Sequence, residues 1–164
     1  MNLTQAPQFS RDMKPGEEDA VEALLRAAFA GQDEATLVRK LRKSGVIAGE
    51  TVMPMGDRIV AYYALSYMIR PTGWLVLAPV AVHPDVQRHG YGKRMIGMLT
   101  EWARLTQTPV VVVGEPGFYE KAGFSRECAA NLVSPYPIAQ TLLAGVGTQA
   151  PAKDLIYPQP FADR

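Results

Sequence analysis

The stretch Val82–Met95, VHPDVQRHGYGKRM, decides the fold, because it joins a long apolar run to a helical pattern through two closely spaced glycines. Gly90 and Gly92 are separated by one residue and stand beside the cations Arg88 and Lys93. Where a strand turns into a helix, glycines let main-chain N–H groups approach an anion, and the helix dipole favours negative charge there. The stretch therefore predicts an anion-binding junction between a strand and a helix.

Apolar runs flank this junction on both sides. Trp74–Val82 (WLVLAPVAV) and Val110–Val113 (VVVV) are continuously apolar, which is typical of parallel strands covered on both faces. The residues between them complete a strand–helix–strand unit. Helical spacing predicts that this helix buries one face, made of Met95, Met98, Leu99, Trp102 and Leu105.

Pro79 interrupts the first of these strands. A proline removes a ladder hydrogen bond, so it is expected at a bulge or where a neighbouring strand departs. A bulge beside the glycine turn would open a gap between the two parallel strands. We expect an extended ligand to lie in that gap.

The N-terminal half predicts two helices and a hairpin. Apolar residues at helical spacing indicate helices over Gly16–Ala30 and Asp33–Lys43. Two strands, Ile47–Met55 and Arg58–Ile69, follow and are joined by a turn at Gly56-Asp57. With the parallel unit, these elements predict a mixed α/β sheet.

Composition limits the classes of function. The chain has 164 residues, 48% of them hydrophobic and 20% charged, and a net charge of +1, which argues against a nucleic-acid footprint. The single cysteine, Cys128, allows no internal disulfide and no CxxC metal site. No apolar run approaches the ~20 residues of a membrane span. We therefore expect a soluble cytoplasmic protein that binds no metal, nucleic acid or membrane.

Two nucleotide-binding patterns fail at this loop. A dinucleotide-binding GxGxxG pattern would need glycine where Met95 stands, and a P-loop would need glycine and Ser or Thr where Gln87 and Arg94 stand. What remains is Q-x-x-G-x-G opening a helix, with consecutive N–H groups aimed at a diphosphate. In the alternative interpretation, Gly90 and Gly92 only shape a tight connection and the cations are solvated.

Two motifs resemble the GNAT superfamily of N-acetyltransferases. VAVHPDVQRHGYGKRM, residues 80–95, resembles the family's acyl-CoA-binding signature V-x-P-x-x-Q-x-x-G-x-G, and GFYEKAGF, Gly117–Phe124, resembles its Y-x-x-x-G-F segment. The resemblance covers roughly residues 10–145 and is strongest to bacterial predicted acetyltransferases. It implies a mixed, mostly antiparallel central sheet with a parallel βαβ acyl-CoA-binding core flanked by helices. We expect this domain to span residues 1–145 and a Pro- and Gly-rich tail, 146–164, to pack on it.

The resemblance also implies how acetyl-CoA is bound. Backbone groups of two residues on the strand before the loop would pair with the pantetheine arm. N–H groups and cations of the loop would hold the phosphates, with less weight on Arg94. The implied cofactor-binding residues are Val80, Val82, Gln87, Arg88, His89, Gly90, Tyr91, Gly92 and Lys93.

The implied reaction is direct acetyl transfer from acetyl-CoA to a primary amine through a tetrahedral intermediate. The N–H of Val82 would stabilise the oxyanion, and Tyr119 would protonate the departing thiolate. Tyr119 has an alternative role as a packing residue against Phe118 and Phe124. The strand before the loop carries no carboxylate, and Glu115 is a candidate base that also suits a helix N-terminus.

Three functions stay open at this stage. The first is an acyltransferase whose amine acceptor is a small molecule or a protein, with a homodimer allowed for; its acceptor pocket would draw on residues 29–34, 62–67 and 134–138. The second is a non-catalytic acyl-CoA-binding or sensor module, which the missing strand carboxylate favours. The third and weakest is a nucleotide-binding protein.

Overall fold

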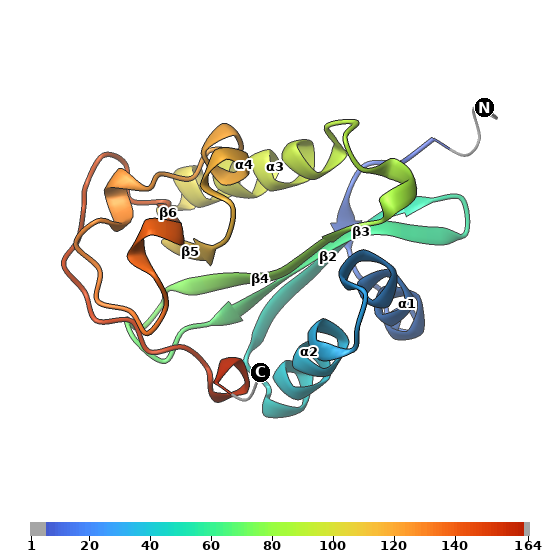
Figure 1. Ribbon diagram of the computed structural model, residues 1–164, viewed down its shortest axis with the longest axis horizontal. Helices are drawn as coiled ribbons and strands as arrows, with labels where there is room; N and C mark the ends of the chain where they lie inside the picture. The colour runs from blue at the N-terminus through green and yellow to red at the C-terminus, as the bar shows by residue number, and fades with distance from the viewer. Residues whose placement is uncertain (1–5, 163–164) are drawn as a thin grey trace.

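The computed structural model describes residues 6–162, in which six strands form one sheet with helices on both faces (Figure 1). The strands lie in chain order, and only the fourth and fifth pair in parallel. The predicted mixed, mostly antiparallel sheet with a parallel βαβ core is therefore confirmed. The strands are β1 (Arg11–Asp12), β2 (Ile47–Met55), β3 (Arg58–Tyr67), β4 (Leu75–Val82), β5 (Val110–Val113) and β6 (Thr141–Ala144).

Helices α1 (Glu18–Phe29) and α2 (Asp33–Ser44) cover one face of the sheet, and α3 (Tyr91–Thr106) and α4 (Pro116–Lys121) cover the other (Figure 1). The first two lie within two residues of their predicted bounds. Gly45 ends α2 in the left-handed conformation, where glycine is favoured, and its N–H donates to a carbonyl of the last turn. Within residues 6–162, no helix is long and apolar enough to cross a membrane.

The hairpin forms as predicted, except that β3 ends at Tyr67 and not at Ile69. The N–H of Ile69 donates to the carbonyl of Ile156 at 2.9 Å, so the chain leaves the sheet to pair with the C-terminal segment. Within that segment, three side chains are buried in a cluster with α2, β4 and β6: Leu155, Tyr157 and Phe161.

The predicted buried face of α3 is wrong for three of its five residues. Met98, Trp102 and Leu105 are 51%, 42% and 68% exposed, whereas Met95 and Leu99 are buried. The helix is rotated toward its small residues, because these let it approach the sheet closely. A Cβ atom at Gly92, for example, would lie only 3.0 Å from Val82 Cγ2. The face that the structure buries consists of Gly92, Met95, Ile96, Leu99 and Ala103.

The bulge expected at Pro79 is present. The β3–β4 register shifts between the pairs Tyr63–Val80 and Leu65–Leu77, so one residue of β3 faces two of β4, Ala78 and Pro79. Strands β4 and β5 pair only at Leu75–Val110 and Val76–Val111 and then part. The predicted gap between the parallel strands is therefore confirmed.

Two buried hydroxyl groups in the sheet give a stability prediction. Thr141 Oγ1 donates to the carbonyl of Pro137 at 2.8 Å, whereas Ser66 Oγ, on β3, has no hydrogen-bond partner in the described part of the chain. Both residues are fully buried. Since an unpaired buried hydroxyl costs free energy, Ser66→Ala should raise the free energy of unfolding by up to about 1 kcal/mol, and Thr141→Val should lower it by about 1 kcal/mol. Urea denaturation of both variants measures the difference, and equal destabilisation would contradict the prediction.

Candidate functional site

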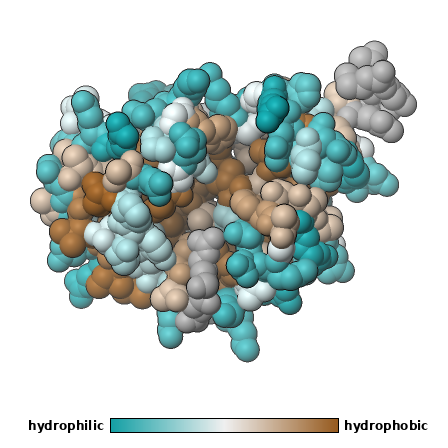
Figure 2. All heavy atoms as spheres, in the orientation of Figure 1, coloured by the Kyte–Doolittle hydropathy of each residue, from teal (hydrophilic) through white to brown (hydrophobic). Residues whose placement is uncertain are grey.

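A cleft of about 750 Å³ opens where β4 and β5 part. Figure 2 shows a hollow near the middle of this face of the molecule, with apolar residues inside it. Strand β4 supplies one wall, and the ends of β5, α3 and α4 supply the others. The end of α1, with Ala28 and Phe29, and the start of α2, with Glu34, close the far side.

The loop between β4 and α3 forms one mouth of the cleft. It begins with a short 3-10 helix, Pro84–Val86, and reverses through Arg88 and Gly90, whose φ angles are 68° and 81°. A non-glycine residue in this left-handed region costs of order 1 kcal/mol, and such strain clusters at functional sites. The first intrahelical bond of α3 runs from the N–H of Arg94 to the carbonyl of Gly90 at 3.0 Å, so the N–H groups of Tyr91, Gly92 and Lys93 lack intrahelical acceptors, and no side chain caps them. The loop therefore has the donors and the dipole that an anion requires.

Backbone groups of β4 face the gap left by β5. The N–H of His83 donates to the carbonyl of Val60 on β3. Because the backbone groups of successive residues point to opposite sides of a strand, the N–H and C=O groups of Val82 and Val80 point away from β3, toward the gap. Gln87 Nε2 donates to the carbonyl of Val82 at 2.8 Å. The side chain of Gln87 therefore holds the strand end to the loop, a role the sequence pattern did not indicate.

Tyr119 lies in the cleft beneath the end of β5. Its ring meets those of Phe118 and Phe124 edge to face, with centroids 4.9 and 5.7 Å apart. A Cβ atom at Gly114 would lie 2.6 Å from Tyr119 Cε2, so only glycine leaves room for the ring there. Burial raises the pKa of Tyr119 to about 12. Its phenol is therefore protonated at neutral pH.

The structure brings together most of the residues that the sequence nominated. Tyr119 and all of the nominated cofactor-binding residues except His89 line the cleft. His89 is directed toward Tyr91, with ring centroids 6.1 Å apart, and does not reach the cleft wall. The exposed cations at the loop mouth are Arg88 and Lys93.

Two of the three expected acceptor regions lie elsewhere. Phe29 and Glu34 line the cleft, but no residue of 62–67 or 134–138 does. Tyr62 is instead fully buried beneath α1 and α2, because β3 is covered on both faces. Glu115 lines the cleft, and its Oε1 accepts from the N–H of Gly117 at 3.2 Å, which caps α4.

In this structure, two parallel strands part beside a helix that begins with the Q-x-x-G-x-G motif. This arrangement defines the GNAT class of N-acetyltransferases, and comparison with known proteins gives the same class. The family model for the GNAT acetyltransferase domain matches residues 42–126, slightly more than half of the chain. The chain belongs to the GNAT acetyltransferase family.

Among curated proteins, the uncharacterized N-acetyltransferase YhbS of Escherichia coli K12 is 26% identical over 128 residues, which cover 75% of this chain and 77% of YhbS. The crystal structure of Escherichia coli YhbS in complex with CoA has a TM-score of 0.80 at 21% identity, covering 94% of this chain and 91% of that one. A GNAT family acetyltransferase from Brucella melitensis in complex with acetyl-CoA has a TM-score of 0.78 at 22% identity, covering 96% and 99%. At these identities, the structures establish a shared fold.

Proposed function

We propose that the protein transfers an acetyl group from acetyl-CoA to a primary amine by direct attack. The observation that carries this proposal is the convergence of three features in one cleft: the uncapped start of α3, the gap-facing backbone of β4, and the protonated hydroxyl of Tyr119. An acyl-CoA is an extended chain with a polyanionic end, which matches a gap that leads from a basic loop to a buried phenol.

The residues at the loop end would hold the donor. First-turn N–H groups of α3 suit a diphosphate, and Arg88 and Lys93 add charge-assisted hydrogen bonds. The N–H of Val82, which lies nearer the loop than that of Val80, suits an amide carbonyl of the pantetheine arm. The carbonyl of Val82 is already engaged by Gln87, so Val82 contributes only its N–H to the gap.

At the other end, the residues would serve the acyl transfer itself. The amine nitrogen attacks the thioester carbon, a C–N bond forms, and the N–H of Val80, which follows the bulge, stabilises the negative oxygen in place of that of Val82. The C–S bond then breaks, and Tyr119 Oη gives its proton to the departing thiolate. Because β4 carries no carboxylate and Glu115 caps α4, we propose that the proton of the amine leaves through water.

A second candidate is a non-catalytic acyl-CoA-binding module. The absence of a carboxylate on β4 favours it, since nothing on that strand accepts the proton of the amine. The two functions differ in turnover and not in binding. Release of free CoA thiol in the presence of a panel of amines separates them.

Donor binding is the first test. Acetyl-CoA at 100 times its dissociation constant should stabilise the protein by about 2.7 kcal/mol, or roughly 5–10 °C in Tm for a chain of this size. ATP and NAD should give smaller shifts. A shift with ATP or NAD but none with acetyl-CoA would overturn the proposal and revive the nucleotide-binding alternative.

Paired cation variants locate the binding end. Arg88→Ala with Lys93→Ala removes two cations from the cleft mouth and should weaken acetyl-CoA binding about tenfold or more. Lys40→Ala with Lys43→Ala removes two exposed cations from α2, outside the cleft, and should leave affinity unchanged. Calorimetric titration at fixed ionic strength measures both, and equal losses would show that the effect is one of net charge.

A further inference from the structure

A second hollow, of about 330 Å³, lies between α3 and the edge of the sheet that β1, β2 and β3 form. It shares no described lining residue with the cleft. Residues of β2 and β3 form its floor, α3 forms one wall, and the segment around β1 forms the opposite wall. Ser10 Oγ donates to Met98 Sδ at 3.9 Å, which joins the two walls at one point. A hollow of this volume is large enough to hold a small molecule.

Three oxygen-bearing side chains lie in one row across this part of the sheet. Asp12 pairs with Thr51 between β1 and β2, and Thr51 pairs with Tyr63 between β2 and β3. Directly paired residues of antiparallel strands carry their side chains on the same face of a sheet. Tyr63 packs in one cluster with Leu99 of α3, so this face is the one that α3 covers. The row therefore brings one carboxylate and two hydroxyl groups to the hollow.

Asp12 gives the hollow its charge. Burial raises the pKa of Tyr63 most, the hydroxyl of Thr51 lowers it, and the charge of Asp12 raises it. These effects require both neighbours to lie close to the phenol. Arg11 also lines the hollow, but its guanidinium donates to both carboxylate oxygens of Glu17, each at 2.9 Å. Among the described lining residues, Asp12 therefore supplies the charge that a ligand meets.

Large apolar side chains surround these oxygen atoms. Trp102 and Met98 of α3 are 42% and 51% exposed at the wall, and Leu65 and Leu99 are buried behind them. An aromatic ring attracts a cation, and a thioether is soft and polarizable. A bare ammonium group carries three N–H donors that all need acceptors, whereas an alkylated ammonium presents apolar groups around its charge. Such walls favour the alkylated cation.

We propose that this hollow binds a small quaternary ammonium ion, with the nitrogen held among Asp12, Tyr63 and Trp102. The carboxylate supplies the opposite charge, the two rings supply cation–π attraction, and Met98 and Leu65 pack against the alkyl groups. A quaternary nitrogen has no N–H and cannot accept an acetyl group. This ligand is therefore distinct from both substrates of the reaction proposed above, and its binding does not rest on that reaction.

The two tryptophans of the chain make binding visible at a single residue. Trp102 lines the hollow, whereas Trp74, just before β4, is buried in a different cluster. Choline chloride, added without acetyl-CoA and compared with NaCl at equal ionic strength, should shift the indole N–H signal of Trp102 in NMR spectra. The signal of Trp74 should stay in place. Trp102→Leu assigns the two signals.

Matched ligands and variants test the chemistry of recognition. Neohexyl alcohol has the shape of choline with carbon in place of nitrogen, and ethanolamine has the charge without the methyl groups. Each should bind at least about tenfold more weakly than choline. Asp12→Asn should weaken choline binding about tenfold. Asp57→Asn removes an equal charge from the exposed hairpin turn, outside the hollow, and should leave the affinity unchanged.

Several results would overturn the proposal. The first is a Trp102 signal that stays in place with choline up to about 50 mM, or one that moves only together with that of Trp74. The second is an Asp12→Asn variant, folded by circular dichroism, that binds choline like wild type. Equal affinity for neohexyl alcohol would show a merely apolar hollow, and tighter binding of ethanolamine would show a site for primary ammonium groups. Because acetyl-CoA is left out, none of these results depends on acetyl transfer.

Discussion

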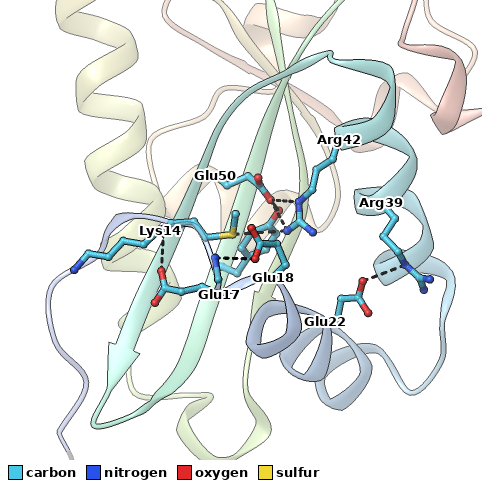
Figure 3. A network of polar contacts seen from close by, with 10 residues as sticks. Lys14, Glu17, Glu18, Glu22, Arg39, Arg42 and Glu50 are labelled. Carbon is cyan, nitrogen blue, oxygen red and sulfur yellow. Dashed lines mark hydrogen bonds and ion pairs between the residues drawn. The ribbon is translucent and has the colours of Figure 1, made fainter.

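Replacing Glu50 with alanine is expected to lower the free energy of unfolding by about 3 kcal/mol, the cost of breaking a buried ion pair from one side. Glu50 Oε1 accepts from Arg42 Nε at 3.0 Å and Nη2 at 2.7 Å, and from the hydroxyl of Tyr62 at 2.6 Å. Figure 3 shows the carboxylate of Glu50 and the guanidinium of Arg42 directed toward each other. The side chains of Arg42 and Glu50 are only 21% and 11% exposed.

The cost arises because two polar groups lose the same partner. Burial, and then the charge of Glu50, raise the pKa of Tyr62 well above its usual range, so its hydroxyl remains a donor. Without Glu50, the buried hydroxyl of Tyr62 loses its acceptor, and the guanidinium of Arg42 keeps only the sulfur of Met13 and the charge of Glu18 near it. The pair also ties the end of α2 to β2 and β3, so its loss loosens the packing of that helix on the sheet.

A surface ion pair from the same view provides the control. Arg39 Nε lies 3.1 Å from Glu22 Oε1, but its side chain is 55% exposed (Figure 3). Arg39→Ala should therefore change stability by no more than about 0.5 kcal/mol. Glu50→Gln keeps an acceptor for Tyr62 while removing the charge, and should fall between the two. Urea denaturation ranks the three variants, and a Glu50→Ala cost as small as that of Arg39→Ala would contradict the burial argument.

Local and periodic features of the sequence predicted the fold well. Two continuous apolar runs around a glycine turn indicated the parallel strands, and Pro79 indicated where they part; both inferences need only residues that are close in sequence. The rotation of α3 was beyond this reasoning. Met98, Trp102 and Leu105 have the same helical spacing as the buried set, and a hydrophobicity pattern gives little weight to Gly92, whose missing side chain lets the helix meet β4.

Side-chain contacts within the site were also beyond sequence reasoning. Strand β3 is buried on both faces, so alternation could not show that Tyr62 points away from the cleft. The bond from Gln87 to Val82 depends on how the loop folds back over the strand end. The contact between Gly114 and Tyr119 had a visible signal, a glycine five residues before the tyrosine, but its meaning required the path of α4.

The second large effect is expected in turnover. If the hydroxyl protonates the departing thiolate, Tyr119→Phe should lower kcat at least about 100-fold. This factor is the lower end of what a positioned general acid contributes. Phenylalanine keeps the ring contacts with Phe118, Phe124 and Gly114, so stability and the acetyl-CoA shift should remain those of wild type. The measurement is CoA release under saturating acetyl-CoA with an amine that the wild-type protein turns over. Tyr67→Phe, which alters a tyrosine 53% exposed at the end of β3, is the control and should not change kcat.

The pH dependence of kcat gives an independent check on the same hydroxyl. Burial raises the pKa of Tyr119 to about 12, so its proton is present throughout the neutral and moderately alkaline range and is lost only as pH rises toward that value. Wild-type kcat should therefore show no fall due to this group below about pH 11, and the deficit of Tyr119→Phe should be constant from pH 7 to 10. A deficit that disappears as pH rises in this range would mean that the hydroxyl of Tyr119 loses its proton well below pH 12.

The outcomes of the Tyr119→Phe experiment also separate the two proposed functions. If wild type and variant both bind acetyl-CoA and neither releases CoA with any amine, the cleft belongs to a binding module, and the hydroxyl has no catalytic role to lose. If both release CoA at equal rates, the transfer reaction holds but Tyr119 is a packing residue between Phe118 and Phe124. If only the variant loses CoA release and its affinity for acetyl-CoA is unchanged, the hydroxyl makes an interaction that exists only while the C–S bond breaks. A group that also held the donor in the ground state would alter the affinity as well.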